Sequence, residues 1–136
     1  MTAPGGTPAR VVILGAGFGG LHVANQLERL LPAGAADVTV VTRETHLLFT
    51  PMLHEAAAAE LDPAHIVTPV RSMLRRSRVL VGEVEAVDLE RRSVTVAHAD
   101  GAHRHVVPYD HLVLALGNVT GVFNLRGVRE PALTMK

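Results

Sequence analysis

The sequence predicts an α/β fold in which a parallel sheet is interrupted by an antiparallel meander. Two short, continuously apolar segments, 10–14 and 37–41, flank a segment with helical spacing. Strands buried on both faces of a parallel sheet have this composition. Apolar and polar residues then alternate between 83 and 108, which is typical of antiparallel strands with one wet face.

Composition limits the class of protein. The chain has 136 residues, enough for one domain, and 13 basic residues balance 13 acidic ones. A net charge of zero and only 3% aromatic residues argue against nucleic acid as a partner. Because the chain has no cysteine, it has no disulfide, no thiolate metal site and no cysteine nucleophile. Nor does any apolar run approach the ~20 residues of a membrane span.

The first elements expected are a leader, a strand, a helix and a second strand. Residues 1–9 are rich in Gly, Pro and Thr and lack the pattern of a signal peptide, so we expect a flexible leader. The strand at 10–14 follows. Apolar residues then share one helical stripe: Leu21, Ala24, Leu27 and Leu31. Pro32 ends this helix before the strand at 37–41, and the connection is long enough for a right-handed parallel crossover.

After a loop at 42–49, two Thr-Pro pairs predict helix starts. We expect Thr50 to cap a helix from Met52 to Leu61, and Thr68 to cap a helix from Val70 to Arg76. Four arginines around this second helix indicate a solvated helix face: Arg71, Arg75, Arg76 and Arg78.

The rest of the chain predicts a short strand, the meander and a last buried strand. The short strand covers 78–81, and in the meander Val84 and Ala86 should share one face, as should Val94 and Val96. The last strand covers 111–116 and is closed by Gly117. The eight histidines show no spacing that favours a metal site.

The turn between the first strand and the helix carries the strongest functional signal. Residues 15–20 read Gly-Ala-Gly-Phe-Gly-Gly and match the G-x-G-x-x-G pattern of a Rossmann-like dinucleotide site. Gly15 permits the tight turn, Gly17 lets the backbone approach a pyrophosphate, and Gly20 lets the helix pack against the sheet. The alternative is a turn with a structural role alone.

The end of the second strand departs from that pattern. Thr42 occupies the position where an acid would bind the ribose hydroxyls, and Arg43 and Glu44 follow it. A threonine hydroxyl makes one such hydrogen bond, while Glu44 is an alternative ribose ligand. Arg43 could instead meet a 2′-phosphate, and a solvated loop start is a further alternative.

Several segments resemble the type II NADH:quinone oxidoreductases, within the FAD-dependent pyridine nucleotide-disulfide oxidoreductase superfamily. The segments are 47–53, 54–59, 109–117 and 119–136, in the order of that family. The resemblance implies that the dinucleotide is FAD and that NADH is the co-substrate. It implies cofactor contacts at Gly15, Gly17, Phe18, Gly19, Gly20, Thr42, Arg43, Glu44, Pro51, Met52, Val84, Ala115, Leu116 and Gly117.

Within these contacts, the resemblance places the stretch 49–52, which includes Pro51 and Met52, beside the isoalloxazine, and the Val84 backbone at the adenine. The segment 115–117 corresponds to a second close approach to FAD. Members of the family usually have an acid where Thr42 stands.

Missing cysteines favour one mechanism. Disulfide reductases of this superfamily carry a redox Cys pair where this chain reads Thr50-Pro51-Met52, and a sulfide:quinone oxidoreductase would show a cysteine near residue 136. Hydride transfer from NADH to flavin, and then electron transfer to quinone, is the mechanism implied. The FAD domain of a sulfide:quinone oxidoreductase-like protein remains an alternative.

The resemblance covers 10–136 as the N-terminal part of an FAD-binding domain. NADH and quinone sites would lie beyond residue 136, so we expect no catalytic residue and no NADH:quinone turnover in this chain alone. The full-length protein would be cytoplasmic, or peripheral on the cytoplasmic face of the membrane. The competing class is a truncated, non-catalytic nucleotide-binding or self-associating module, with a homodimer covering exposed apolar surface.

Overall fold

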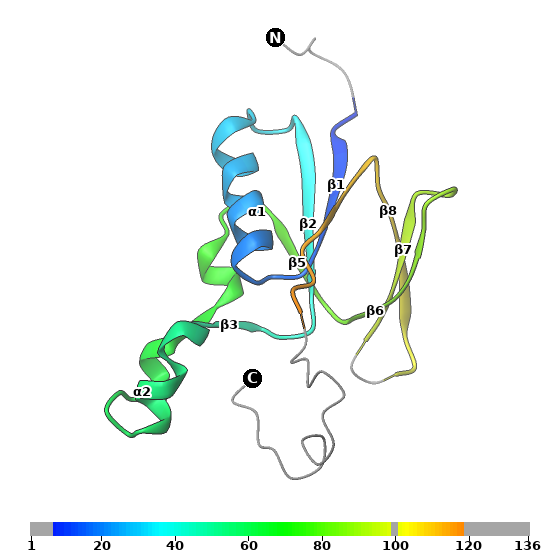
Figure 1. Ribbon diagram of the computed structural model, residues 1–136. Helices are drawn as coiled ribbons and strands as arrows, with labels where there is room; N and C mark the ends of the chain where they lie inside the picture. The colour runs from blue at the N-terminus through cyan, green and yellow to red at the C-terminus, as the bar shows by residue number, and fades with distance from the viewer. Residues whose placement is uncertain (1–6, 99–100, 119–136) are drawn as a thin grey trace.

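A computed structural model describes residues 7–98 and 101–118 and shows three layers (Figure 1). The middle layer is a parallel sheet with the order β5-β2-β1-β9. Its strands are β1 (Ala9–Leu14), β2 (Ala36–Thr42), β5 (Arg78–Val81) and β9 (His111–Leu114). The expected α/β fold with a parallel sheet is therefore confirmed, with β1 starting one residue earlier and β9 ending two residues earlier than expected.

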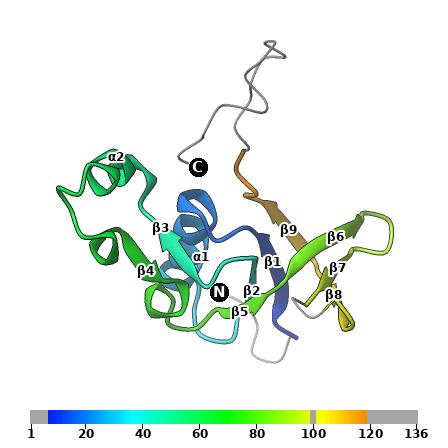
Figure 2. The ribbon, with the colours of Figure 1, turned by 90° about the horizontal axis from the view of Figure 1, so that it is seen from below.

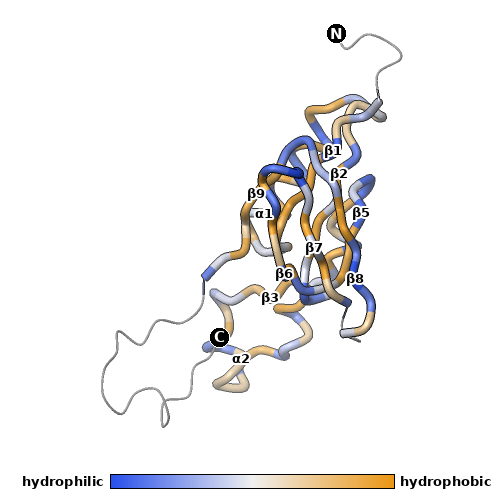
Figure 3. Tube along the Cα trace, turned by 90° about the vertical axis from the view of Figure 1, so that its right-hand side faces the viewer, coloured by the Kyte–Doolittle hydropathy of each residue, from blue (hydrophilic) through white to orange (hydrophobic). Residues whose placement is uncertain are grey.

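Both faces of this sheet are covered, because successive residues of β1 point to opposite sides. Val11 and Ile13 pack with α1 (Phe18–Leu30) on one face. Val12 and Leu14 pack on the other face against the antiparallel meander, at Val94 among others. The meander consists of β6 (Glu83–Asp88), β7 (Ser93–Ala97) and β8 (Arg104–Pro108). Figure 3 shows hydrophobic residues along the strands where these layers meet.

A β-bulge changes the expected alternation in β6. Val84 lies opposite Val96, but Ala86 lies opposite Thr95, so the register shifts by one residue between them. Ala86 is consequently exposed while Val84 packs against the core, and the expectation that they share one face is wrong.

Residues 46–69 form an arm that extends from the body of the protein (Figures 1 and 2). Its strands pair antiparallel, and its helices are short. The elements are β3 (His46–Leu48), η1 (Thr50–Met52), α2 (Leu53–Ala57), η2 (Pro63–Ile66) and β4 (Val67–Pro69). A further 3-10 helix, η3 (Val70–Met73), follows and buries Val70 in the core.

The arm corrects several expectations. The loop at 42–49 contains β3, and Thr68 lies in β4 rather than at a helix cap. Thr50 is already inside η1, where Phe49 is the capping residue and makes no side-chain bond. The expected helices at 52–61 and 70–76 are reduced to α2 and η3, because β3–β4 pairing and the burial of Val70 fix the backbone around them.

The end of α2 explains why its alanine run does not continue the helix. Ala59 adopts a left-handed conformation with φ of 58°. Its N–H donates to Ala56 O at 3.1 Å, and the Glu60 N–H donates to Glu55 O at 2.9 Å. This pair of bonds is a Schellman motif, which usually has glycine at the left-handed position.

Ala59→Gly is therefore expected to stabilise the protein by about 0.5–1 kcal/mol, because glycine adopts positive φ without a Cβ penalty. Urea unfolding followed by circular dichroism measures the change. Ala57→Gly, at the last residue of α2, is the matched control and should destabilise by up to a similar amount, since Ala57 has no need of positive φ. Equal destabilisation by both variants would contradict the assigned role of Ala59.

Candidate functional site

Four chain segments meet at the carboxyl edge of the parallel sheet. The Gly15 N–H donates to Val41 O, the Gly82 N–H to Thr42 O and the Ala115 N–H to Leu14 O, each at 2.8 Å. The chain adds β2 and β5 on one side of β1, and β9 on the other. The strand order therefore reverses between β1 and β9, and ligands of open α/β sheets bind at such a switch point.

At two positions of the turn, Gly15 and Gly20, neighbouring atoms of the protein leave no room for a Cβ. Gly15 has φ of 103°, and a Cβ at this position would overlap the Ala115 carbonyl. A Cβ at Gly20 would overlap the Gly15 carbonyl and would also touch the Ala115 side chain, 3.4 Å away. These contacts hold β1, α1 and the segment after β9 together.

At Gly17 and Gly19, by contrast, packing within the protein does not require glycine. A Cβ on either residue would meet nothing within 4 Å. Gly17 caps α1 with φ of −77° and ψ of −170°, a conformation open to other residues. Gly17, Phe18 and Gly19 are exposed in succession, so open space lies beside this part of the backbone.

The same place has the chemistry to hold an anion. The first N–H groups of a helix have no acceptor within it, and its N-terminus carries a partial positive charge. No acidic residue occupies the first turn of α1, and no side chain caps it. The residues present thus fit the pyrophosphate of a dinucleotide, for which the open space at Gly17 and Gly19 would leave room.

At the end of β2, the Thr42 hydroxyl is used within the protein. Thr42 is 9% exposed, and its Oγ1 donates to the Glu44 backbone carbonyl at 3.0 Å. The side chains of Arg43 and Glu44 are exposed at the same edge. Of these three residues, Glu44 offers the more accessible oxygen ligand.

The other residues expected to contact the cofactor near the carboxyl edge of the sheet differ in burial. Ala115 is half-buried against the turn, whereas Leu116 is exposed and Gly117 has φ of 74°. Val84 is half-buried in β6, just after Gly82. The structure thus brings the glycine turn, Thr42 and 115–117 together.

Pro51 and Met52 lie in η1 of the arm. An aromatic contact just before η1 was not predicted from the sequence. The rings of Phe18 and Phe49 meet edge to face, with centroids 5.6 Å apart and planes at 87°. This contact joins the start of α1 to the start of η1. Two phenylalanines 31 positions apart show no periodicity that would have revealed it.

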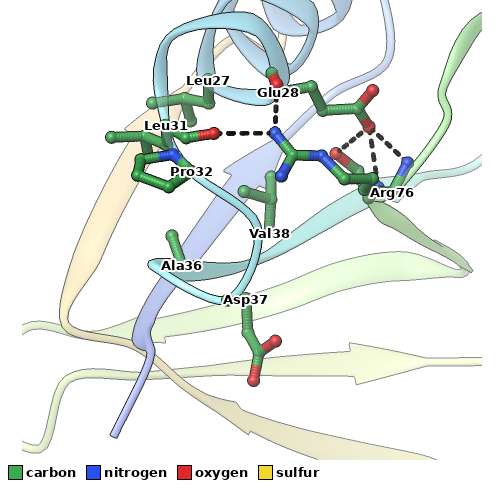
Figure 4. Close-up of a pocket in the computed structure, with 10 residues that line it drawn as sticks. Leu27, Glu28, Leu31, Pro32, Ala36, Asp37, Val38 and Arg76 are labelled. Carbon is green, nitrogen blue, oxygen red and sulfur yellow. Dashed lines mark hydrogen bonds between the residues drawn. The ribbon is translucent and has the colours of Figure 1, made fainter. Parts of the chain in front are cut away.

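A polar cluster lies at the other end of α1, around a cavity of about 160 Å³ (Figure 4). The Glu28 carboxylate accepts the N–H groups of Arg76 at 2.9 Å and Ser77 at 2.7 Å, and that of Arg75 at 3.0 Å. Desolvation raises the pKa of Glu28, but these bonds and the Ser77 hydroxyl outweigh it and lower the pKa to about 2.

The guanidinium of Arg76 in turn donates to the Glu28 and Leu31 carbonyls at the end of α1. Arg75 and Arg76 follow η3 in a loop, so the expected solvated helix face is wrong for them. The positive charge of Arg76, near the carboxyl end of α1, complements the helix dipole.

The His98 and His105 rings lie 4.6 Å apart, but within residues 7–98 and 101–118 no three His, Asp or Glu side chains are grouped to hold a metal. No helix among these residues has the length and apolar character to cross a membrane.

Known proteins are similar to most of this chain. The family described as pyridine nucleotide-disulphide oxidoreductase matches residues 9–136. A type II NADH:quinone oxidoreductase, NdhA of Mycobacterium tuberculosis, is 40% identical over 126 residues, which is 86% of this chain and 26% of that protein. The chain thus spans about a quarter of the length of this curated relative.

Solved structures agree with the sequence comparison. NDH2 from Plasmodium falciparum in complex with NADH superposes with a TM-score of 0.76 at 25% identity, covering 90% of this chain and 25% of that one. The sulfide:quinone oxidoreductase from Aquifex aeolicus superposes with a TM-score of 0.68 at 25% identity, covering 80% and 24%.

Proposed function

Because the chain belongs to the pyridine nucleotide-disulphide oxidoreductase family, we propose that it is the FAD-binding N-terminal portion of an NADH:quinone oxidoreductase. The family is one of oxidoreductases that use FAD and pyridine nucleotides, which agrees with the resemblance. The observation that carries the proposal is the open backbone at Gly17 and Gly19, where the chain itself has no need of glycine.

The proposed contacts follow from the site. The free N–H groups at the start of α1 bind the pyrophosphate, and Gly17 keeps the approach open. Glu44 binds the ribose, since the Thr42 hydroxyl already donates within the loop. Val84 provides backbone groups for the adenine. Pro51, Met52 and the segment 115–117 border the flavin.

In the proposed enzyme, the cofactor supplies the redox chemistry and the protein positions it. Bound FAD supplies the capacity to accept a hydride from NADH and to pass electrons to quinone. The residues of this chain bind and orient it. The NADH and quinone sites and the peripheral attachment to the cytoplasmic face of the membrane belong, in this proposal, to the remaining part of a longer protein, with 10–136 as the leading part of its FAD domain.

A specific observation supports self-association as a second candidate. Within the described residues β9 pairs with β1 alone, and two leucines, Leu114 in β9 and Leu116 after it, are 68% and 65% exposed. A second copy could cover this apolar surface.

Titration of the purified chain with FAD tests the main proposal. Flavin fluorescence should reach a one-to-one end point, and riboflavin, which lacks the pyrophosphate and adenosine, should bind at least tenfold more weakly, a difference of about 1.4 kcal/mol. A dimer in size-exclusion chromatography that takes up no FAD would instead support the self-association candidate.

A further inference from the structure

The outer part of the arm lacks a core that would fix its orientation. None of the residues of η1 and α2 is buried. The base of the arm is anchored, since Ile66 is 3% exposed and Leu47 packs against the main core. The position of η1 relative to the glycine turn therefore depends on contacts at its root.

The Phe18–Phe49 contact is at that root. Both rings are about half exposed, at 50% and 43%, so burial in the core does not explain them. The Phe49 N–H donates to Ile66 O at 2.7 Å, and its carbonyl accepts the Met52 N–H at 3.1 Å. The backbone of Phe49 is thus fixed to both the base of the arm and η1, so its ring contact with α1 positions η1.

We propose that Phe49 is a positioning residue whose contact with Phe18 sets the separation between the pyrophosphate and flavin ends of the FAD site. Phe18 begins α1 between Gly17 and Gly19, at the pyrophosphate end. Phe49 immediately precedes η1, which holds Pro51 and Met52 at the flavin end. The inference rests on the proposed function, because it assumes that one FAD spans both ends.

Binding of FAD and of ADP to the complete chain tests the proposal, since ADP occupies the pyrophosphate end alone. Phe49→Leu keeps apolar bulk but removes the edge-to-face contact. It should raise the Kd for FAD about two- to tenfold, the range expected for an aromatic pair, and leave the Kd for ADP unchanged. Phe49→Tyr retains the ring and should restore FAD binding. Leu48→Ala, at the neighbouring exposed side chain, is the control and should change neither Kd.

Two results would overturn the inference. In one, Phe49→Leu leaves FAD binding unchanged. In the other, it weakens FAD and ADP equally, which indicates a general structural role. Both require that the unmodified chain binds FAD. If the unmodified chain binds neither ligand, the proposed function itself is wrong, and the inference fails with it.

Discussion

Gly20→Ala is expected to destabilise the protein by about 3 kcal/mol or more, a large part of the stability of a small domain. The new Cβ would overlap the Gly15 carbonyl, and the Ala115 side chain lies close on another side. The Gly15 carbonyl is part of the backbone and the Ala115 methyl is bonded directly to it, so neither neighbour can move aside as a flexible side chain would. The start of α1 must therefore separate from β1 and from the segment after β9.

Urea unfolding of Gly20→Ala and Gly19→Ala provides a matched pair. Gly19 lies one position earlier in α1, and its Cβ would meet nothing within 4 Å. Alanine there should raise the free energy of unfolding by about 0.5 kcal/mol, because alanine favours helix more than glycine does. Comparable destabilisation by the two substitutions would refute the packing role assigned to Gly20.

Glu28→Ala should also have a large effect, a loss of about 2 kcal/mol in the free energy of unfolding, which allows for the exposure of several of its bonds to water. Its carboxylate accepts three backbone N–H groups, from Arg75, Arg76 and Ser77, and joins the end of α1 to the chain before β5. Charge-assisted hydrogen bonds are the stronger kind, and removing the acceptor takes it from the part-buried N–H and hydroxyl of Ser77, while water can reach the exposed N–H groups of Arg75 and Arg76. Glu60→Ala, at an exposed side chain in the arm, should change little.

The pH dependence gives a second check on Glu28. Its pKa is about 2 in the folded protein, below the ordinary value of 4.5 that applies to an unfolded chain. The stabilisation is thus fully present above pH 4.5 and is lost as the pH falls through 2. The difference in stability between the unmodified protein and Glu28→Gln should be smaller at pH 3.5 than at pH 7. A difference that stays constant would show that the charge of Glu28 has no role.

The central sheet could be predicted from local sequence, while the arm could not. The apolar runs of β1, β2 and β9 indicate burial on both faces, and the structure supplies α1 and the meander to cover them. The pairing of β3 with β4 depends on residues about 20 positions apart. Such pairing overrode the helix signals of Thr50 and Thr68.

The site shows the same division between local and non-local information. The glycine pattern identified the turn, but only the structure separates Gly20, which the chain requires, from Gly17, which it does not. Glu28 was missed because its partners lie 47–49 positions away. The Phe18–Phe49 contact likewise has no local signature.

FAD titration of Gly17→Asp tests whether the open turn at Gly17 holds a pyrophosphate. Aspartate suits the helix cap and the positive end of α1, so stability should be unchanged or higher by about 0.5 kcal/mol. Its carboxylate would occupy the N–H groups and repel the pyrophosphate. The unmodified chain should bind one FAD, whereas Gly17→Asp should remain folded and bind none. Equal FAD affinity in the two folded proteins would show that the turn at Gly17 does not hold the pyrophosphate.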